Sequence, residues 1–193
     1  TVHTARTAVI GAGVAALNAA DHLHELGHDD FMIVTDSLGG VSSDPASARA
    51  NYYRMGMAWG TPDSPIAFAK TLCDGGMTHG DNAYVEAVNS IPEFLHLVRN
   101  GVRFPRDSYG EYAGSGEANR LASAGPQTSA IMAEKSLARV KQGKAPILVR
   151  HEVICLLTTG EGEARHIIGA LAVDLRKASK PTESLVLAMV MST

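Results

Sequence analysis

Cysteine, aromatic residues and long apolar runs are all scarce in this chain of 193 residues. The two cysteines, Cys73 and Cys155, lack the CxxC spacing of redox and zinc motifs, so we expect no disulfide framework and a reduced, cytoplasmic compartment. The longest apolar run, residues 185–191, has the length of a strand, whereas a membrane helix needs about 20 apolar residues. Residues 1–6 are polar and do not resemble a secretory leader. The sequence therefore predicts no transmembrane segment.

An excess of charge of one sign is also missing. The 17 lysine and arginine residues and the 20 acidic residues give a formal net charge of -3, and no basic run exceeds the pair Arg176 and Lys177. Proteins that bind nucleic acid neutralise its phosphates with clustered basic side chains, so nucleic acid is not an expected partner. The histidines His22, His24 and His28 have no cysteine or carboxylate at metal-ligand spacing, so no metal site is expected.

The first 35 residues contain a strand, a helix and a second strand. Residues 7–10 are a short apolar run stopped by Gly11, which is typical of a buried parallel strand. Residues 31–35 predict the second strand, and Gly27 stands where the helix between them is expected to end. The apolar face of this helix repeats every three or four residues, at Ala16, Ala19, Ala20, Leu23 and Leu26. This βαβ unit predicts an α/β fold with a parallel, Rossmann-like sheet.

A glycine-rich turn joins the first strand to the helix. It consists of Gly11, Ala12, Gly13, Val14, Ala15 and Ala16. In this context Gly11 permits a tight turn, Gly13 lets the backbone approach a pyrophosphate, and Ala16 keeps the helix close to the strand. The N–H groups of the first helical turn then face the phosphate oxygens. The pattern predicts dinucleotide binding, with a tight turn that holds no ligand as the alternative.

A carboxylate at the end of the second strand is expected to bind the adenosine ribose. Asp36 lies 20 residues after Ala16, but counting along the strand puts Thr35 where the acid usually stands. We favour Asp36, and the alternation of side chains along a strand leaves open which of the two contacts the ribose. A surface turn residue without a ligand is the alternative for Asp36.

Residues 36–64 are rich in glycine and serine and show no sustained helical period. An NAD-binding domain would continue as βαβαβ with short connections, so a long excursion at this point favours FAD. Excursions of more than about 15 residues in compact domains are usually functional. An NAD(P)-binding Rossmann domain stays an alternative.

The rest of the chain predicts helices and then strands. Helices are expected over residues 66–72, 82–89, 90–100 and 128–141, the third starting at a capping box formed by Ser90 and Glu93 with Pro92 in its first turn. Strands are expected over residues 147–149, 153–157, 167–175 and 184–191, with a β-meander around the turn at 158–163. We expect one FAD-binding domain over residues 1–193, in which residues 36–145 form a helical and loop excursion between sheet strands.

Four stretches carry a family resemblance: residues 11–16, 34–37, 63–81 and 94–106. In this order they resemble the flavoprotein subunits of succinate dehydrogenase, fumarate reductase and L-aspartate oxidase. The resemblance implies the N-terminal part of a Rossmann-like FAD-binding fold, completed by further sequence or a second chain. It also implies an oxidoreductase that exchanges hydride between flavin N5 and a small carboxylate substrate, such as a dicarboxylate.

The same resemblance implies a set of cofactor contacts. Ribose, phosphate and flavin contacts map onto Asp36, Ser37, Ser42 and Ser43, and a backbone contact to the adenine maps onto Val153. Respiratory members attach flavin covalently to a histidine shortly after the second strand, but residues 36–64 contain no histidine. The resemblance therefore implies non-covalent FAD.

Catalytic residues are not identified by the sequence. His79 and Arg106 are the candidates, as groups that handle a proton or an anion on the substrate side. A cofactor-binding or structural module without turnover of its own, completed by another chain, is the alternative to an enzyme.

Overall fold

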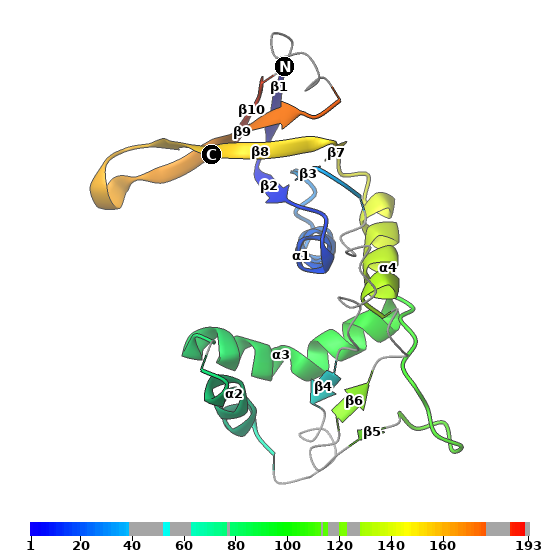
Figure 1. Cartoon of the computed structure of the whole chain (residues 1–193). Helices are drawn as coiled ribbons and strands as arrows, with labels where there is room; N and C mark the ends of the chain where they lie inside the picture. The colour runs from blue at the N-terminus through cyan, green and yellow to red at the C-terminus, as the bar shows by residue number, and fades with distance from the viewer. Residues whose placement is uncertain are drawn as a thin grey trace. The chain divides into compact units, whose positions relative to one another are not determined.

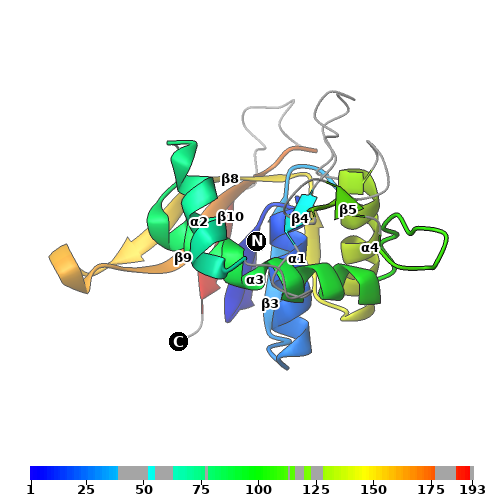
Figure 2. The same cartoon turned by 90° about the horizontal axis from the view of Figure 1, so that it is seen from below.

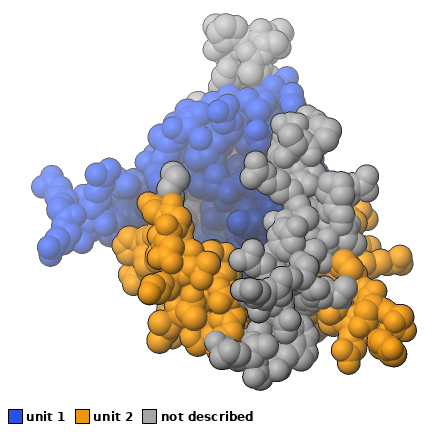
Figure 3. All heavy atoms as spheres, turned by 60° about the horizontal axis from the view of Figure 1, so that its bottom comes forward, with its two compact units in different colours: residues 1–42, 136–193 blue, residues 43–135 orange. Residues whose placement is uncertain are grey.

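The structure of the protein is a computed structural model. It describes residues 1–38, 52–54, 63–76, 78–112, 114–115, 120–122, 128–176 and 186–191. The chain divides into two compact units, one of residues 1–42 and 136–193 and one of residues 43–135 (Figure 3). That residues 1–193 form one domain with an excursion over 36–145 stays a prediction.

A parallel sheet forms the centre of the first unit. Its order is β2-β3-β7, with β2 (Thr7–Ile10), β3 (Phe31–Thr35) and β7 (Ile147–Val149) all parallel. Helix α1 (Val14–Glu25) connects β2 to β3 and packs against both (Figure 1). All five residues of β3 are buried, because it lies between two neighbours. The predicted βαβ unit is confirmed, although Ile10 at the end of β2 is 50% exposed and not buried as expected.

A second sheet of the first unit has the order β1-β10-β9-β8. Strands β8 (His151–Thr159) and β9 (His166–Asp174) form the expected antiparallel hairpin, and β10 (Val186–Met191) pairs antiparallel with β9. Strand β1 (Val2–Ala5) was not predicted, and it forms because it pairs parallel with β10, which is distant in sequence. The two sheets share one apolar core, made of Ala5, Met32, Val34, Ala170 and Ala172 with Leu148 and Val153 packed against it. The α/β fold class with a parallel sheet and an antiparallel segment is confirmed.

The chain passes from one sheet to the other at Arg150, between β7 and β8. Arg150 has a φ of 63°, a left-handed conformation that is rare for a residue with a side chain. The backbone N–H of Leu175 donates to the carbonyl of Arg150 (2.8 Å), and His151 Nδ1 lies 2.9 Å from the carbonyl oxygen of Val149. These contacts fix the corner at which β7 ends and β8 begins.

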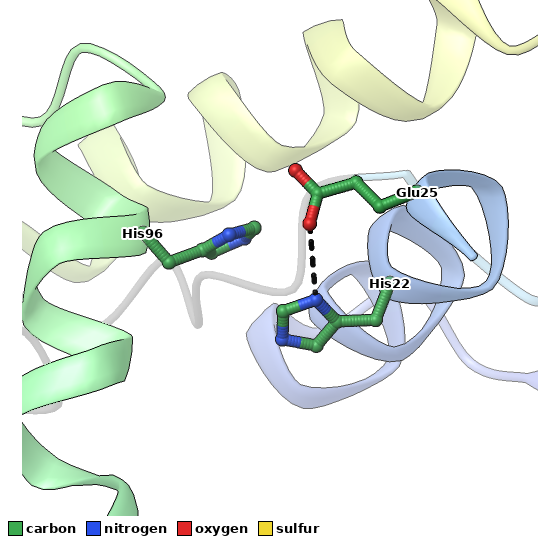
Figure 4. Close-up of side chains that lie close together, drawn as sticks. All are labelled: His22, Glu25 and His96. Carbon is green, nitrogen blue, oxygen red and sulfur yellow. Dashed lines mark ion pairs between the residues drawn. The ribbon is translucent and has the colours of Figure 1, made fainter.

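Ionic side chains join α1 to the end of α4 (Thr128–Gln142) within the first unit. Asp21 is buried, and its Oδ1 lies 3.4 Å from Nε of Arg139. Arg139 Nη2 also lies 3.3 Å from Glu25, which pairs with His22 at 3.5 Å (Figure 4). A buried carboxylate requires such partners because removing its charge from water is costly. The network therefore ties the last turns of α4 to α1.

The described part of the second unit includes a pair of packed helices and a small antiparallel sheet. Helix α2 (Pro65–Asp74) packs on α3 (Gly80–Arg99), as Figures 1 and 2 show. The sheet has the order β4-β6-β5, with β4 (Tyr52–Arg54), β6 (Arg120–Ala122) and β5 (Gly114–Ser115). An aromatic cluster lies beside α3, and its members are Tyr53, Phe94, Phe104 and Tyr112.

Helix α3 corrects one sequence-based expectation. The capping box at Ser90 and Glu93 was expected to start a new helix, but α3 runs without a break from Gly80 to Arg99, with Pro92 inside it. Ser90 is 4% exposed, and its Oγ donates to the carbonyl of Arg54 in β4 (3.2 Å) instead of capping a helix. Packing against β4 thus outweighs the hydrogen bond that Pro92 cannot donate.

A buried ion pair anchors β4 to the start of α2. Two N–H groups of Arg54 donate to the carboxylate oxygens of Asp63 at 2.7 and 2.8 Å, and the Ser64 amide donates to Asp63 at 2.8 Å. The Asp63 side chain is 6% exposed. Burial by itself raises the pKa of Asp63, but the hydrogen bonds from Arg54 and Ser64 and the charge of Arg54 hold that pKa below its usual value.

Candidate functional site

The glycine-rich turn, residues 11–16, lies between β2 and α1 at the carboxyl end of the parallel sheet. Gly11 has a φ of +102°, a conformation that residues other than glycine rarely adopt. Its backbone N–H donates to the carbonyl of Val34 in β3, at 2.7 Å. A Cβ placed on Gly11 would lie 4.0 Å from the Cβ of Ala16, so the helix begins close to the strand. These contacts explain why glycine and alanine occupy the turn.

The first turn of α1 offers backbone donors that have no partner inside the helix. Gly13 is the N-cap residue of α1, with no side-chain cap, and the first hydrogen bond of the helix runs from Leu17 N–H to Gly13 C=O (2.9 Å). The N–H groups of Val14, Ala15 and Ala16 therefore have no partner inside the helix. The first turn contains no acidic residue, and a Cβ added at Gly13 would meet nothing within 4 Å. Among the described residues no side chain comes near Gly13, and the helix dipole makes this end electropositive, which suits an anion.

The end of β3 separates the two ribose candidates. Thr35 is 3% exposed, whereas Asp36 and Ser37 are exposed. The Thr35 hydroxyl donates to the carbonyl of Ser37 at 2.7 Å, and Ser37 Oγ donates to Asp36 Oδ1 at 3.1 Å. The Thr35 hydroxyl is therefore used inside the protein, and the Asp36 carboxylate reaches solvent.

The remaining residues expected to contact the cofactor are Val153, Ser42 and Ser43. Val153 lies in β8 opposite Ala172 of β9, just before an irregularity in the register of the two strands. Strand β8 follows β7 in the chain, and the last residue of β7, Val149, is the register partner of Thr35. The chain therefore enters β8 from the edge of the parallel sheet at which β3 ends. Ser42 and Ser43 lie outside the described residues.

The two catalytic candidates both belong to the second unit. His79 precedes α3, is exposed, and lies 3.9 Å from Asp81. The Arg106 guanidinium stacks on the ring of Tyr112 at 3.9 Å from its centroid and donates to the carbonyl of Gly110. Arg106 thus has structural contacts of its own, and the role of either residue in catalysis stays a prediction.

The glycine-rich turn lies in a segment that matches a known protein family. A profile of the FAD binding domain family matches residues 6–190, which includes the turn and every strand of the parallel sheet. The chain belongs to this family. A search of curated proteins finds no match.

Solved structures share the fold of this family member. Sdh1 of Mycobacterium smegmatis, in complex with UQ1, superposes with a TM-score of 0.75 and 19% identity, over 98% of this chain and 33% of that chain. FrdA of Escherichia coli quinol fumarate reductase superposes with a TM-score of 0.73 and 15% identity, over 98% of this chain and 32% of that chain. A 3-ketosteroid dehydrogenase of Rhodococcus jostii RHA1, in complex with 4-androstene-3,17-dione, superposes with a TM-score of 0.65 and 13% identity. The superposition covers 97% of this chain and 44% of that chain. The chain thus spans about a third of the length of the first two.

These matches confirm the expected FAD-binding fold, which the chain shares with succinate dehydrogenase and fumarate reductase flavoproteins. At identities of 13–19% they show the fold alone. Within the described ranges, none of the helices is both long and apolar enough to cross a membrane.

Proposed function

We propose that this chain is the FAD-binding part of a flavin-dependent oxidoreductase, with FAD held non-covalently. The observation that carries the proposal is the open N-terminus of α1 at Gly13, where three backbone N–H groups have no partner in the helix. The match of the FAD binding domain family over residues 6–190 favours FAD over NAD(P).

In this proposal the pyrophosphate lies at the glycine-rich turn. The N–H groups of Val14, Ala15 and Ala16 donate to the phosphate oxygens, and the dipole of α1 adds a favourable field. The empty space around the Cβ position of Gly13 supports this placement, because the backbone there can approach a ligand without a side chain in the way. Ala12 within the turn is buried.

The adenosine end lies beside β3 and β8 in the proposal. Asp36 accepts hydrogen bonds from the ribose hydroxyls, which its exposure and the inward position of Thr35 support. The backbone of Val153 contacts the adenine, and Ser37, Ser42 and Ser43 complete the ribose, phosphate and flavin contacts. The assignments of Val153 and the three serines come from the family resemblance, whereas Asp36 also follows from its place directly after the second strand.

FAD when bound supplies hydride exchange at flavin N5. The chain's own residues bind and orient the cofactor, and a small carboxylate, such as a dicarboxylate, is the proposed substrate. The fold shared with FrdA of quinol fumarate reductase supports this choice. Because the chain spans about a third of that protein, further sequence or a second chain completes the active site, and His79 and Arg106 are candidates for its substrate side.

Two further parts of the proposal follow from residue content. Residues 36–64 contain no histidine, so a covalent bond of the respiratory type has no acceptor in that segment. Cys73 and Cys155 are both free, which agrees with a reducing, cytoplasmic compartment.

The visible absorption spectrum of the purified protein tests the proposal. We expect flavin bands, and we expect acid precipitation to release all of the flavin into the supernatant as FAD. Protein that lacks these bands but binds NADH would support an NAD(P)-binding domain instead. Flavin that stays with the precipitate would contradict non-covalent attachment. Addition of fumarate or succinate with a redox dye then distinguishes an enzyme, which turns over, from a cofactor-binding module, which does not.

A further inference from the structure

The end of β3 is organised by one buried hydroxyl group. Thr35 is the only polar residue of β3 and is 3% exposed. Its Oγ1 donates to the carbonyl of Ser37 at 2.7 Å and lies 3.4 Å from the Ser37 amide, whose N–H points at it. The residue before Thr35, Val34, is held to the glycine-rich turn by the Gly11 amide at 2.7 Å. The backbone on both sides of Thr35 is therefore fixed.

The turn closed by Thr35 brings two hydroxyl groups close to the Asp36 carboxylate, because Thr35 Oγ1 and Ser37 Oγ lie 3.5 and 3.1 Å from Asp36 Oδ1. Asp36 is the central residue of this turn, and Ser37 Oγ donates to its Oδ1 at 3.1 Å. Asp36 is exposed, so without the turn its side chain would be free to sample several rotamers. A carboxylate that must meet two hydroxyl groups of one ribose binds more tightly when it is already oriented, because less conformational entropy is lost on binding.

We infer that Thr35 is a positioning residue for the nucleotide: its hydroxyl holds the turn that presents Asp36 to the ribose, without contacting the ligand. The inference rests on the proposed function, since it requires that Asp36 bind the adenosine ribose. It assigns different roles to the two residues that the sequence could not separate.

A double-mutant cycle on the full chain tests this role. Flavin fluorescence gives the Kd for FAD of the wild type, Thr35→Val, Thr35→Ser, Asp36→Asn and the double variant Thr35→Val/Asp36→Asn. Valine has nearly the shape of threonine and removes only the hydroxyl. We expect Thr35→Val to raise the Kd about threefold to tenfold, the loss typical of one hydrogen bond. We expect Thr35→Ser to bind like the wild type, because serine keeps the hydroxyl.

The Asp36→Asn background separates positioning from a general effect on folding. If Thr35 acts through Asp36, adding Thr35→Val to Asp36→Asn changes the Kd by less than about twofold. An equal loss in both backgrounds, or an unchanged Kd in Thr35→Val alone, would overturn the inference. Should Thr35→Val fail to fold, Thr35→Ala replaces it in the same cycle. A wild type that binds no FAD would overturn the proposed function and this inference together, whereas the other two results would leave the proposed function intact.

Discussion

The backbone N–H of Gly11 donates a hydrogen bond to the carbonyl oxygen of Val34, at an N···O distance of 2.7 Å. This bond links the glycine-rich turn to the end of β3. We propose that these two segments bind different parts of one nucleotide. The positive φ of Gly11 turns the chain from β2 toward α1 directly after this bond. The places proposed for phosphate and ribose are therefore fixed relative to each other by the backbone of the first unit.

Gly13→Val is expected to abolish flavin retention while leaving the fold intact. Gly13 has φ −71° and ψ 172°, which valine adopts readily, and an added Cβ meets nothing in the protein. The side chain would instead occupy the space through which phosphate approaches. We expect the Kd for FAD to rise at least about tenfold, or ~1.4 kcal/mol, while the FAD-free variant unfolds at a temperature close to that of the FAD-free wild type.

Gly80→Val is the matched control for this substitution. Gly80 at the start of α3 is also a glycine whose added Cβ meets nothing, but it lies in the second unit and outside the glycine-rich turn. We expect its flavin content to equal that of the wild type. Normal FAD binding by Gly13→Val would show that the turn is not the phosphate site.

Pro92→Ala is expected to stabilise the protein by about 1–3 kcal/mol in urea unfolding. Pro92 is exposed and lies inside the continuous helix α3, where its ring removes a backbone hydrogen bond. If Ser90 instead started a new helix, Pro92 would occupy a favourable first-turn position and alanine would bring no gain. The sign of the change thus distinguishes one long helix from two shorter ones.

Asp63→Asn is expected to destabilise the protein by about 3 kcal/mol near neutral pH, because it leaves the mostly buried Arg54 without its anionic partner. The pKa of Asp63 is lowered in the folded state from its ordinary 3.8, so its contribution is present above that pH and is lost as the pH falls through the lower folded value. The difference in unfolding free energy between wild type and variant should therefore shrink below pH 3.8. A difference that is independent of pH would contradict the ion pair.

The first βαβ unit could be predicted from sequence because each of its elements has its own local signal. The run at residues 7–10, the repeat along α1 and the run at residues 31–35 each show the period of the structure they form. The glycine-rich turn was found because it lies between them. These signals depend on neighbours in sequence, so the βαβ unit could be predicted without knowledge of any long-range contact.

The failures came where distant contacts decide the outcome. Strand β1 has no apolar run and forms by pairing with β10, more than 180 residues later. The motif at Ser90 has the spacing of a helix start, but Ser90 is used as a donor to Arg54, 36 residues earlier. Thr35 and Asp36 could not be separated because the pattern of a strand does not show how its end turns, and that turn depends on a side-chain hydrogen bond to Ser37.

The most direct test of the account is a titration of the isotope-labelled protein with FAD, followed by the amide resonances in its nuclear magnetic resonance spectrum. Binding of the pyrophosphate at the start of α1 predicts that the largest shifts occur at the amides of Gly13, Val14, Ala15 and Ala16, with smaller shifts at Asp36. Saturable FAD binding that leaves these amides unchanged, or no binding at all, would contradict the account.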